Sequence, residues 1–148
     1  MAAIRRYSSG DFKPVVLLEA KSSGSFYGAC VFIRQMESVA QPAFFVSVTE
    51  GEISGYTIGS RVFQSAETGW ILRLQVKTQF QRMGIGRSLV ERLILEFQGY
   101  GINDVFLSVS PNNLSALSLY KSLGFIEDFF KEEYFGPGED RWILKKTI

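Results

Sequence analysis

The heptapeptide QRMGIGR, residues 81–87, stands between an apolar run at residues 70–76 and a segment with helical spacing. This order predicts a strand, a glycine loop and a helix. Because glycine lets the backbone approach a ligand closely and the first amides of a helix have no internal partner, such a turn can hold phosphate oxygens. Arg82 and Arg87 add cationic donors that suit phosphate. The loop therefore predicts the pyrophosphate cradle of a coenzyme; the alternative is a helix start whose glycines serve no ligand.

Strand and helix patterns alternate on both sides of this loop. Apolar runs bounded by turn residues predict strands at residues 2–7, 43–49, 53–60, 70–76, 104–110, 125–134 and 141–146. Helical spacing predicts helices at residues 12–21, at 26–39, after the loop as far as about residue 99, and at about 113–123. The sequence therefore predicts one α/β or α+β domain over residues 1–148, with a mixed, mostly antiparallel sheet.

Side-chain placement can be predicted in two of these segments. Side chains along a strand alternate between its two faces. Along residues 70–76, one face would carry Leu72, Leu74 and Val76, and the other would carry Ile71, Arg73 and Gln75. In the helix at residues 26–39, the aromatic residues Phe26, Tyr27 and Phe32 either pack or line a pocket, and packing in the core is favoured.

Composition limits the classes of function. The chain has 148 residues, of which 46% are hydrophobic and 21% charged, as in an ordinary globular domain with a buried core. Its net charge of +1 lacks the basic excess of nucleic-acid-binding domains, so no nucleic-acid partner is expected. Local groups must then hold any anionic ligand.

Cysteine and histidine counts narrow the chemistry further. The single Cys30 excludes an internal disulfide and fits a reducing compartment. No apolar run approaches the roughly 18 residues of a membrane span, and no secretory signal pattern is present, so a cytoplasmic protein without membrane contact is expected. Histidine is absent, which removes the commonest metal ligand and acid-base residue. No metal is therefore expected.

A second constellation lies on the helix expected near residues 113–123. Asn113, Ala116 and Tyr120 follow one another at i, i+3 and i+7, so they project from one side of that helix. One helix face could thus touch an extended ligand at two points. The alternative is that Asn113 only caps the helix and Tyr120 only packs.

Together these two stretches resemble the Gcn5-related N-acetyltransferase (GNAT) family. Residues 74–76 followed by QRMGIG are similar to its coenzyme A motif, and residues 113–125, NLSALSLYKSLGF, look like its second motif. Both occur in the expected order, and the likeness spans essentially the whole chain. It implies a sheet that splays between its fourth and fifth strands and about four flanking helices.

The resemblance implies transfer of an acetyl group from acetyl-coenzyme A to an amine, by direct attack in a ternary complex. The residues that match coenzyme-binding positions are Leu74, Val76, Gln81, Arg82, Met83, Gly84, Ile85, Gly86, Arg87, Ser88, Asn113, Ala116 and Tyr120. Tyr120 would also be the catalytic residue. Tyrosine has a pKa of about 10 and a thiol about 8.5, so at neutral pH the Tyr120 hydroxyl carries its proton and can hydrogen-bond to the departing thiolate and protonate it.

The predicted hairpin at the end of the chain bears on the acceptor. Residues 134–141, YFGPGEDR, resemble a segment of protein N-terminal acetyltransferases, including the ribosomal protein alanine acetyltransferases, that helps wall the peptide channel. Tyr134 could cover a peptide backbone and bond to it. Glu139 could contact the substrate, and the alternative for the acidic pair is a polar turn.

One departure from the family pattern affects the mechanism. Ser108 stands where the ribosomal protein alanine enzymes have a glutamate base. Gln75 is no base either, so deprotonation would use water or an acid from elsewhere, such as Glu139. An α-amine, with a pKa of about 8, is substantially neutral at pH 7.4, whereas lysine, at about 10.4, is not. The missing base therefore favours an α-amine at a protein or peptide N-terminus.

Two other functions remain open from the sequence. One is an acetyltransferase for small amines. Polycationic acceptors are compatible with the acidic residues on the expected acceptor side, Glu50, Glu52, Glu139 and Asp140. The other is a non-catalytic module that binds coenzyme A, favoured by the missing glutamate and opposed by Tyr120. A monomer and a homodimer are equally compatible with the sequence.

Overall fold

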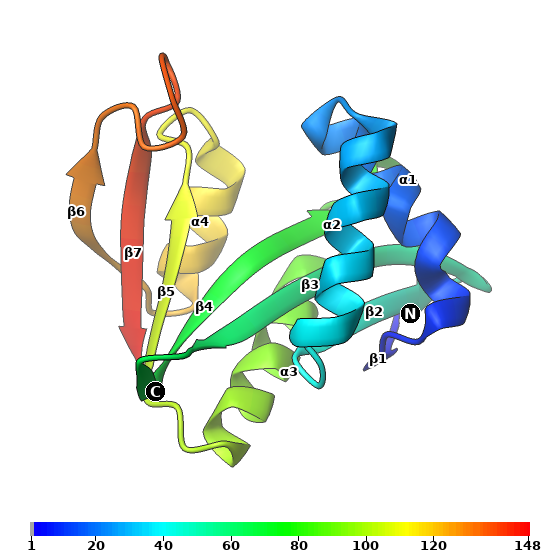
Figure 1. The fold of residues 1–148 in the computed structure, drawn as a ribbon, viewed down its shortest axis with the longest axis horizontal. Helices are drawn as coiled ribbons and strands as arrows, with labels where there is room; N and C mark the ends of the chain where they lie inside the picture. Colours follow the sequence, from blue (N-terminus) through cyan, green and yellow to red (C-terminus); the bar gives the residue numbers. More distant parts are fainter. Residues whose placement is uncertain (1) are drawn as a thin grey trace.

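One seven-stranded sheet organises the molecule, which is described here by a computed structural model covering residues 2–148. The strand order is β1-β2-β3-β4-β5-β7-β6 (Figure 1). The strands are β1 (Ala3–Arg6), β2 (Phe44–Thr49), β3 (Glu52–Val62), β4 (Ser65–Val76), β5 (Asp104–Val109), β6 (Ile126–Lys131) and β7 (Arg141–Thr147). All neighbouring pairs are antiparallel except β4–β5, which confirms the predicted mixed sheet.

Four α-helices cover the two faces of this sheet. They are α1 (Phe12–Ser23), α2 (Phe26–Val39), α3 (Ile85–Gly99) and α4 (Leu114–Ser122). Val15 of α1 and Ile33 of α2 pack with Phe44 on one face, whereas Leu93 of α3 packs with Phe45 on the other. Alternate residues of β2 therefore serve two separate cores, as the period of two along a strand requires.

Two strand boundaries differ from the predicted ones by three residues or more. β4 starts at Ser65, five residues before the apolar run, because a tight turn lets Ser65 pair with Val62. The first residues of β4 are exposed. β6 ends at Lys131, and the chain then forms a loop in which Glu139 N–H donates to the carbonyl of Gly136. Exposed strand ends carry no hydrophobic signal, so the sequence pattern did not reveal them.

The sheet splits between β4 and β5. These parallel strands are paired at three positions, Thr68 with Asp104, Gly69 with Val105 and Trp70 with Phe106. Beyond Trp70 they diverge, as the ribbons show (Figure 1). This splay confirms the predicted opening between the fourth and fifth strands.

A β-bulge interrupts β4 directly after the split. Leu72 has no partner on β3, because neighbouring β3 residues pair with Arg73 and Ile71. Ile71, Leu74 and Val76 consequently face the α3–α4 side, whereas Leu72 packs on the α1–α2 side. The predicted placements of Leu72 with Leu74 and of Ile71 with Arg73 are therefore wrong, since a bulge adds one residue and reverses the alternation that follows.

The aromatic residues of α2 divide differently from the prediction. Phe32 packs against the buried cluster beneath α1 and α2, but the side chains of Phe26 and Tyr27 are 62% and 79% exposed. Core packing is thus wrong for the latter two, because they lie in the first turn, beyond the reach of the sheet. Among the helices of residues 2–148, none has the length and apolarity needed to cross a bilayer.

Candidate active site

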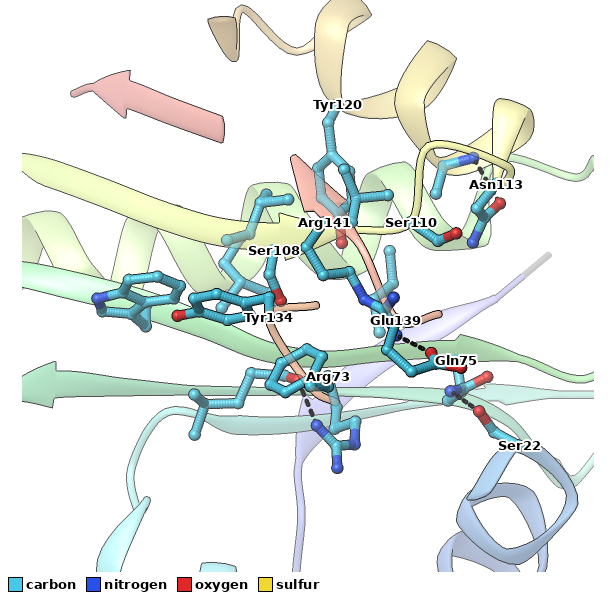
Figure 2. A pocket seen from close by; sticks show the side chains of 18 of the residues that line it. Ser22, Arg73, Gln75, Ser108, Ser110, Asn113, Tyr120, Tyr134, Glu139 and Arg141 are labelled. Atoms are coloured by element: carbon cyan, nitrogen blue, oxygen red, sulfur yellow. Dashed lines mark hydrogen bonds and ion pairs between the residues drawn. The ribbon is translucent and has the colours of Figure 1, made fainter. Parts of the chain in front are cut away.

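A cavity of about 760 Å³ occupies the split between β4 and β5 (Figure 2). Its walls come from α1, β4, β5, α4 and the loop between β6 and β7. Eight of the residues predicted for the site line it: Leu74, Gln75, Ser108, Asn113, Ala116, Tyr120, Tyr134 and Glu139. The structure therefore brings the two motif stretches and the final loop to one place.

The glycine loop and Val76 lie outside the lining of this cavity. Arg82 and Gly84 both have left-handed backbones, with φ of +63° and +80°, and α3 begins at Ile85. The loop is open to solvent, and Met83 is 58% exposed. Exposed amides at the start of a helix are available to an anion.

Gly86 connects this loop to the cavity wall. A Cβ atom at this position would lie 3.3 Å from Leu119 Cδ2 and 3.8 Å from both Leu74 Cδ2 and Val76 Cγ2. The first turn of α3 therefore packs closely on α4 and on the end of β4. Leu74 belongs to both the cavity and this contact, so the first turn of α3 adjoins the cavity wall.

Asn113 caps α4 and still faces the cavity. Its Oδ1 accepts from the backbone N–H of Ala116 at 3.2 Å. This confirms the predicted cap, but it uses only the side-chain oxygen. Within residues 2–148 no acceptor binds the side-chain NH₂ group, so the two interpretations of Asn113 are compatible.

Tyr120 points from α4 into the cavity (Figure 2). Its side chain packs edge-on against Phe125, with ring centroids 5.5 Å apart, and the residue is only 6% exposed. Burial raises the pKa of its hydroxyl above the ordinary value of 10, because desolvation disfavours the phenolate. The hydroxyl therefore stays protonated at neutral pH and can donate a proton.

The opposite wall consists of polar and aromatic side chains. Ser108 lies on β5 and Gln75 on β4, where Gln75 Nε2 donates to Ser22 Oγ at 2.9 Å. Tyr134 stands at the mouth of the cavity in the loop between β6 and β7. Glu139 accepts from Arg141 Nη2 at 3.0 Å, so the carboxylate of that loop is already paired.

Three charged residues of the cavity wall were missed in the sequence: Glu19, Arg73 and Arg141. Glu19 is 3% exposed, and its oxygens accept from Arg73 Nε at 3.1 and 3.2 Å and from the Tyr56 hydroxyl. One signal was available for Glu19. It follows Val15 by four positions, and a carboxylate on the apolar side of a helix is unusual.

Sequence comparison identifies the family to which this site belongs. The profile of the Acetyltransferase (GNAT) family matches residues 12–125, well over half of the chain. The chain belongs to the GNAT family. It is accordingly an N-acetyltransferase that uses acetyl-coenzyme A, which confirms the prediction from the two motifs.

Individual relatives agree with this assignment. An N-alpha-acetyltransferase of Sulfolobus acidocaldarius is 25% identical over 155 residues, covering 98% of this chain and 92% of the relative. A ribosomal protein bS18-alanine N-acetyltransferase of Escherichia coli is 31% identical over 97 residues, covering 66% and 64%. The crystal structure of Ard1 from Thermoplasma volcanium shares the fold, with a TM-score of 0.87 and 23% identity over 99% of this chain and 97% of that one.

Proposed function

We propose that this GNAT enzyme acetylates the α-amine at the N-terminus of a protein or peptide. The observation that carries the proposal is the presence of Ser108 in the cavity wall, where the family resemblance implies a glutamate base. A serine accepts no proton at neutral pH, and an α-amine with a pKa of about 8 needs less help than lysine at about 10.4. The names of the relatives from Sulfolobus acidocaldarius and Escherichia coli support the same acceptor.

The donor would be bound mainly by backbone groups. Leu74 and Val76 lie where β4 has no β5 partner, so their peptide groups can pair with the pantetheine arm. The amides of residues 82–87 are placed to bind the pyrophosphate, and the Asn113 NH₂ group can bind the arm beside α4. Bound acetyl-coenzyme A supplies an activated thioester. Three features fit this ligand: the edge of β4 that has no β5 partner, the exposed glycine loop and the Asn113 NH₂ group that the helix cap does not use.

Tyr120 would act as the general acid. Its protonated hydroxyl points into the cavity and can hydrogen-bond to the thioester sulfur, then pass its proton to the departing thiolate. On the acceptor side, Tyr134 would cover the peptide backbone. Glu139, with Arg141 as its partner, would take the amine proton through water.

A panel of three acceptors tests the proposal. Purified enzyme receives acetyl-coenzyme A and either a lysine-free peptide with a free N-terminus, the same peptide blocked and carrying one lysine, or spermidine. We expect the free N-terminus to react about 100-fold faster than lysine at pH 7.4, following the fractions of neutral amine. Faster turnover of the lysine peptide or of spermidine would contradict the proposed acceptor. We place the reaction in the cytoplasm, where the free thiol of Cys30 would stay reduced.

A further inference from the structure

The β4 bulge lies two residues beyond the point where β4 leaves β5. The last pair between these strands is Trp70 with Phe106, and Leu72 is the residue without a partner on β3. Strand side chains alternate, so one extra residue decides the face of every residue after it. The bulge thus decides how Leu74 and the following residues of β4 are presented to the coenzyme.

Side chains bind both carbonyl groups of the bulge. Arg73 Nη1 donates to the carbonyl of Leu72 at 2.9 Å. Thr57 Oγ1, on β3, donates to the carbonyl of Arg73 at 2.9 Å. The course of β4 through the bulge therefore depends on where the Arg73 guanidinium and the Thr57 hydroxyl are held.

Groups on α1 and α2 hold the Arg73 guanidinium. Glu19 of α1 accepts from Arg73 Nε with both oxygens and also binds the Tyr56 hydroxyl of β3. The ring of Phe32, on α2, lies against the guanidinium, with its centroid 4.3 Å from Arg73 Cζ. A carboxylate this buried is destabilising without its cation, so Glu19 and Arg73 depend on each other.

We propose that Glu19 and Arg73 are positioning residues for acetyl transfer. Together they fix the bulge and hence the edge of β4 that binds the coenzyme. This inference rests on the proposed acetyl-coenzyme A site. Glu19 takes no proton from the acceptor, because its oxygens already accept from Arg73 and Tyr56.

Steady-state kinetics of Glu19→Gln and Arg73→Met test this role, with both substrates varied and acetyl-coenzyme A affinity measured by calorimetry. Each variant should raise the KM for acetyl-coenzyme A about tenfold and lower kcat about tenfold, while the acceptor KM stays within about twofold. Arg34→Met is the matched control, because it breaks an arginine–glutamate ion pair within α2, with Glu37, that lies outside the cavity. It should leave all constants unchanged.

Arg73→Lys separates the ion pair from the contact within β4. Lysine can reach Glu19 but lacks the second fixed donor that binds the carbonyl of Leu72. We expect it to be as impaired as Arg73→Met. Wild-type kinetics in Arg73→Lys, or a defect confined to the acceptor KM in Glu19→Gln, would overturn the positioning role.

Thr57→Val provides the same test if the Glu19 or Arg73 variants do not fold. Valine has the shape of threonine but removes the donor to the carbonyl of Arg73, and we expect about a threefold rise in the KM for acetyl-coenzyme A. An unchanged KM would contradict the inference. Binding of coenzyme A by the wild-type enzyme, measured first, tests the proposed function separately from these variants.

Discussion

The two walls of the cavity are built by different means. The proposed donor wall, made of Leu74 and α4 in the cavity and of Val76 and the glycine loop beside it, offers mainly backbone groups. The acceptor wall, made of α1, the Arg73 side chain and the β6–β7 loop, consists of side chains joined in ion pairs, Glu19 with Arg73 and Glu139 with Arg141. In the proposed function, recognition of the donor would therefore depend on backbone shape, whereas recognition of the acceptor would depend on replaceable side chains.

Removing the Tyr120 hydroxyl should have the largest effect. Tyr120→Phe should lower kcat by about 10²- to 10³-fold, the usual contribution of a general acid, and leave coenzyme A affinity within about twofold. Steady-state kinetics and calorimetry measure the two quantities. Tyr100→Phe, at a 51% exposed position outside the cavity, is the control. If kcat stays above one tenth of the wild-type value, Tyr120 is not the acid.

Adding one methyl group at Gly86 should damage the donor wall selectively. The new Cβ would press on Leu119 and fill the junction of loop and cavity, at a cost of about 2 kcal/mol or about 30-fold in the KM for acetyl-coenzyme A. Gly99→Ala in the last turn of α3 meets nothing within 4 Å and should raise the melting temperature slightly. Equal KM values for the two variants would contradict the assignment of the loop.

The pH dependence of kcat/KM should follow the titration of the acceptor amine and not that of the Tyr120 hydroxyl. As the pH rises from 7 to 9, an α-amine with a pKa of about 8 becomes neutral, and kcat/KM should rise about tenfold. Burial raises the pKa of Tyr120 above 10, so its proton remains in place and no decline from this residue should occur up to pH 10. Rates measured with a peptide acceptor give the profile. A fall beginning near pH 8 would require a more acidic catalytic group.

The smallest effect is expected from the exposed ion pair of the acceptor wall. Because an α-amine is substantially neutral at pH 7.4 without a base, Glu139→Gln should lower kcat and raise the acceptor KM by no more than about threefold each and leave the KM for acetyl-coenzyme A unchanged. Because Glu139 is half exposed, its pair with Arg141 contributes at most about 1 kcal/mol to stability. Initial rates with each substrate varied in turn distinguish the walls. A change in the coenzyme KM alone would show that they are not independent.

The donor wall was predictable from the sequence because its requirements are local. Left-handed Gly84 and the Asn113 cap are each imposed by neighbouring backbone, and they leave fixed spacings along the chain. The strand and helix pattern was predictable for the same reason. The predicted faces of Ile71 and Leu72 were wrong, because the bulge arises from pairing with β3 and not from the local sequence.

The acceptor wall was not predictable to the same degree. Glu19 and Arg73 are 54 residues apart, and their partnership depends on how α1 packs against the sheet. Arg141 begins β7, as predicted, but its ion pair with Glu139 depends on the shape of the β6–β7 loop. Ion pairs between distant segments have no characteristic spacing along the chain. The sequence therefore shows which residues are charged but not which of them will pair.

The three paired positions between β4 and β5 give the sheet the form of a two-tined fork. One tine carries the glycine loop, and the other, through α4, carries Tyr120. A coenzyme that touches both tines would hold the two strands at a fixed separation. Coenzyme A without its acetyl group would hold them at the same separation. The acceptor would then meet a gap of constant width, set by the donor.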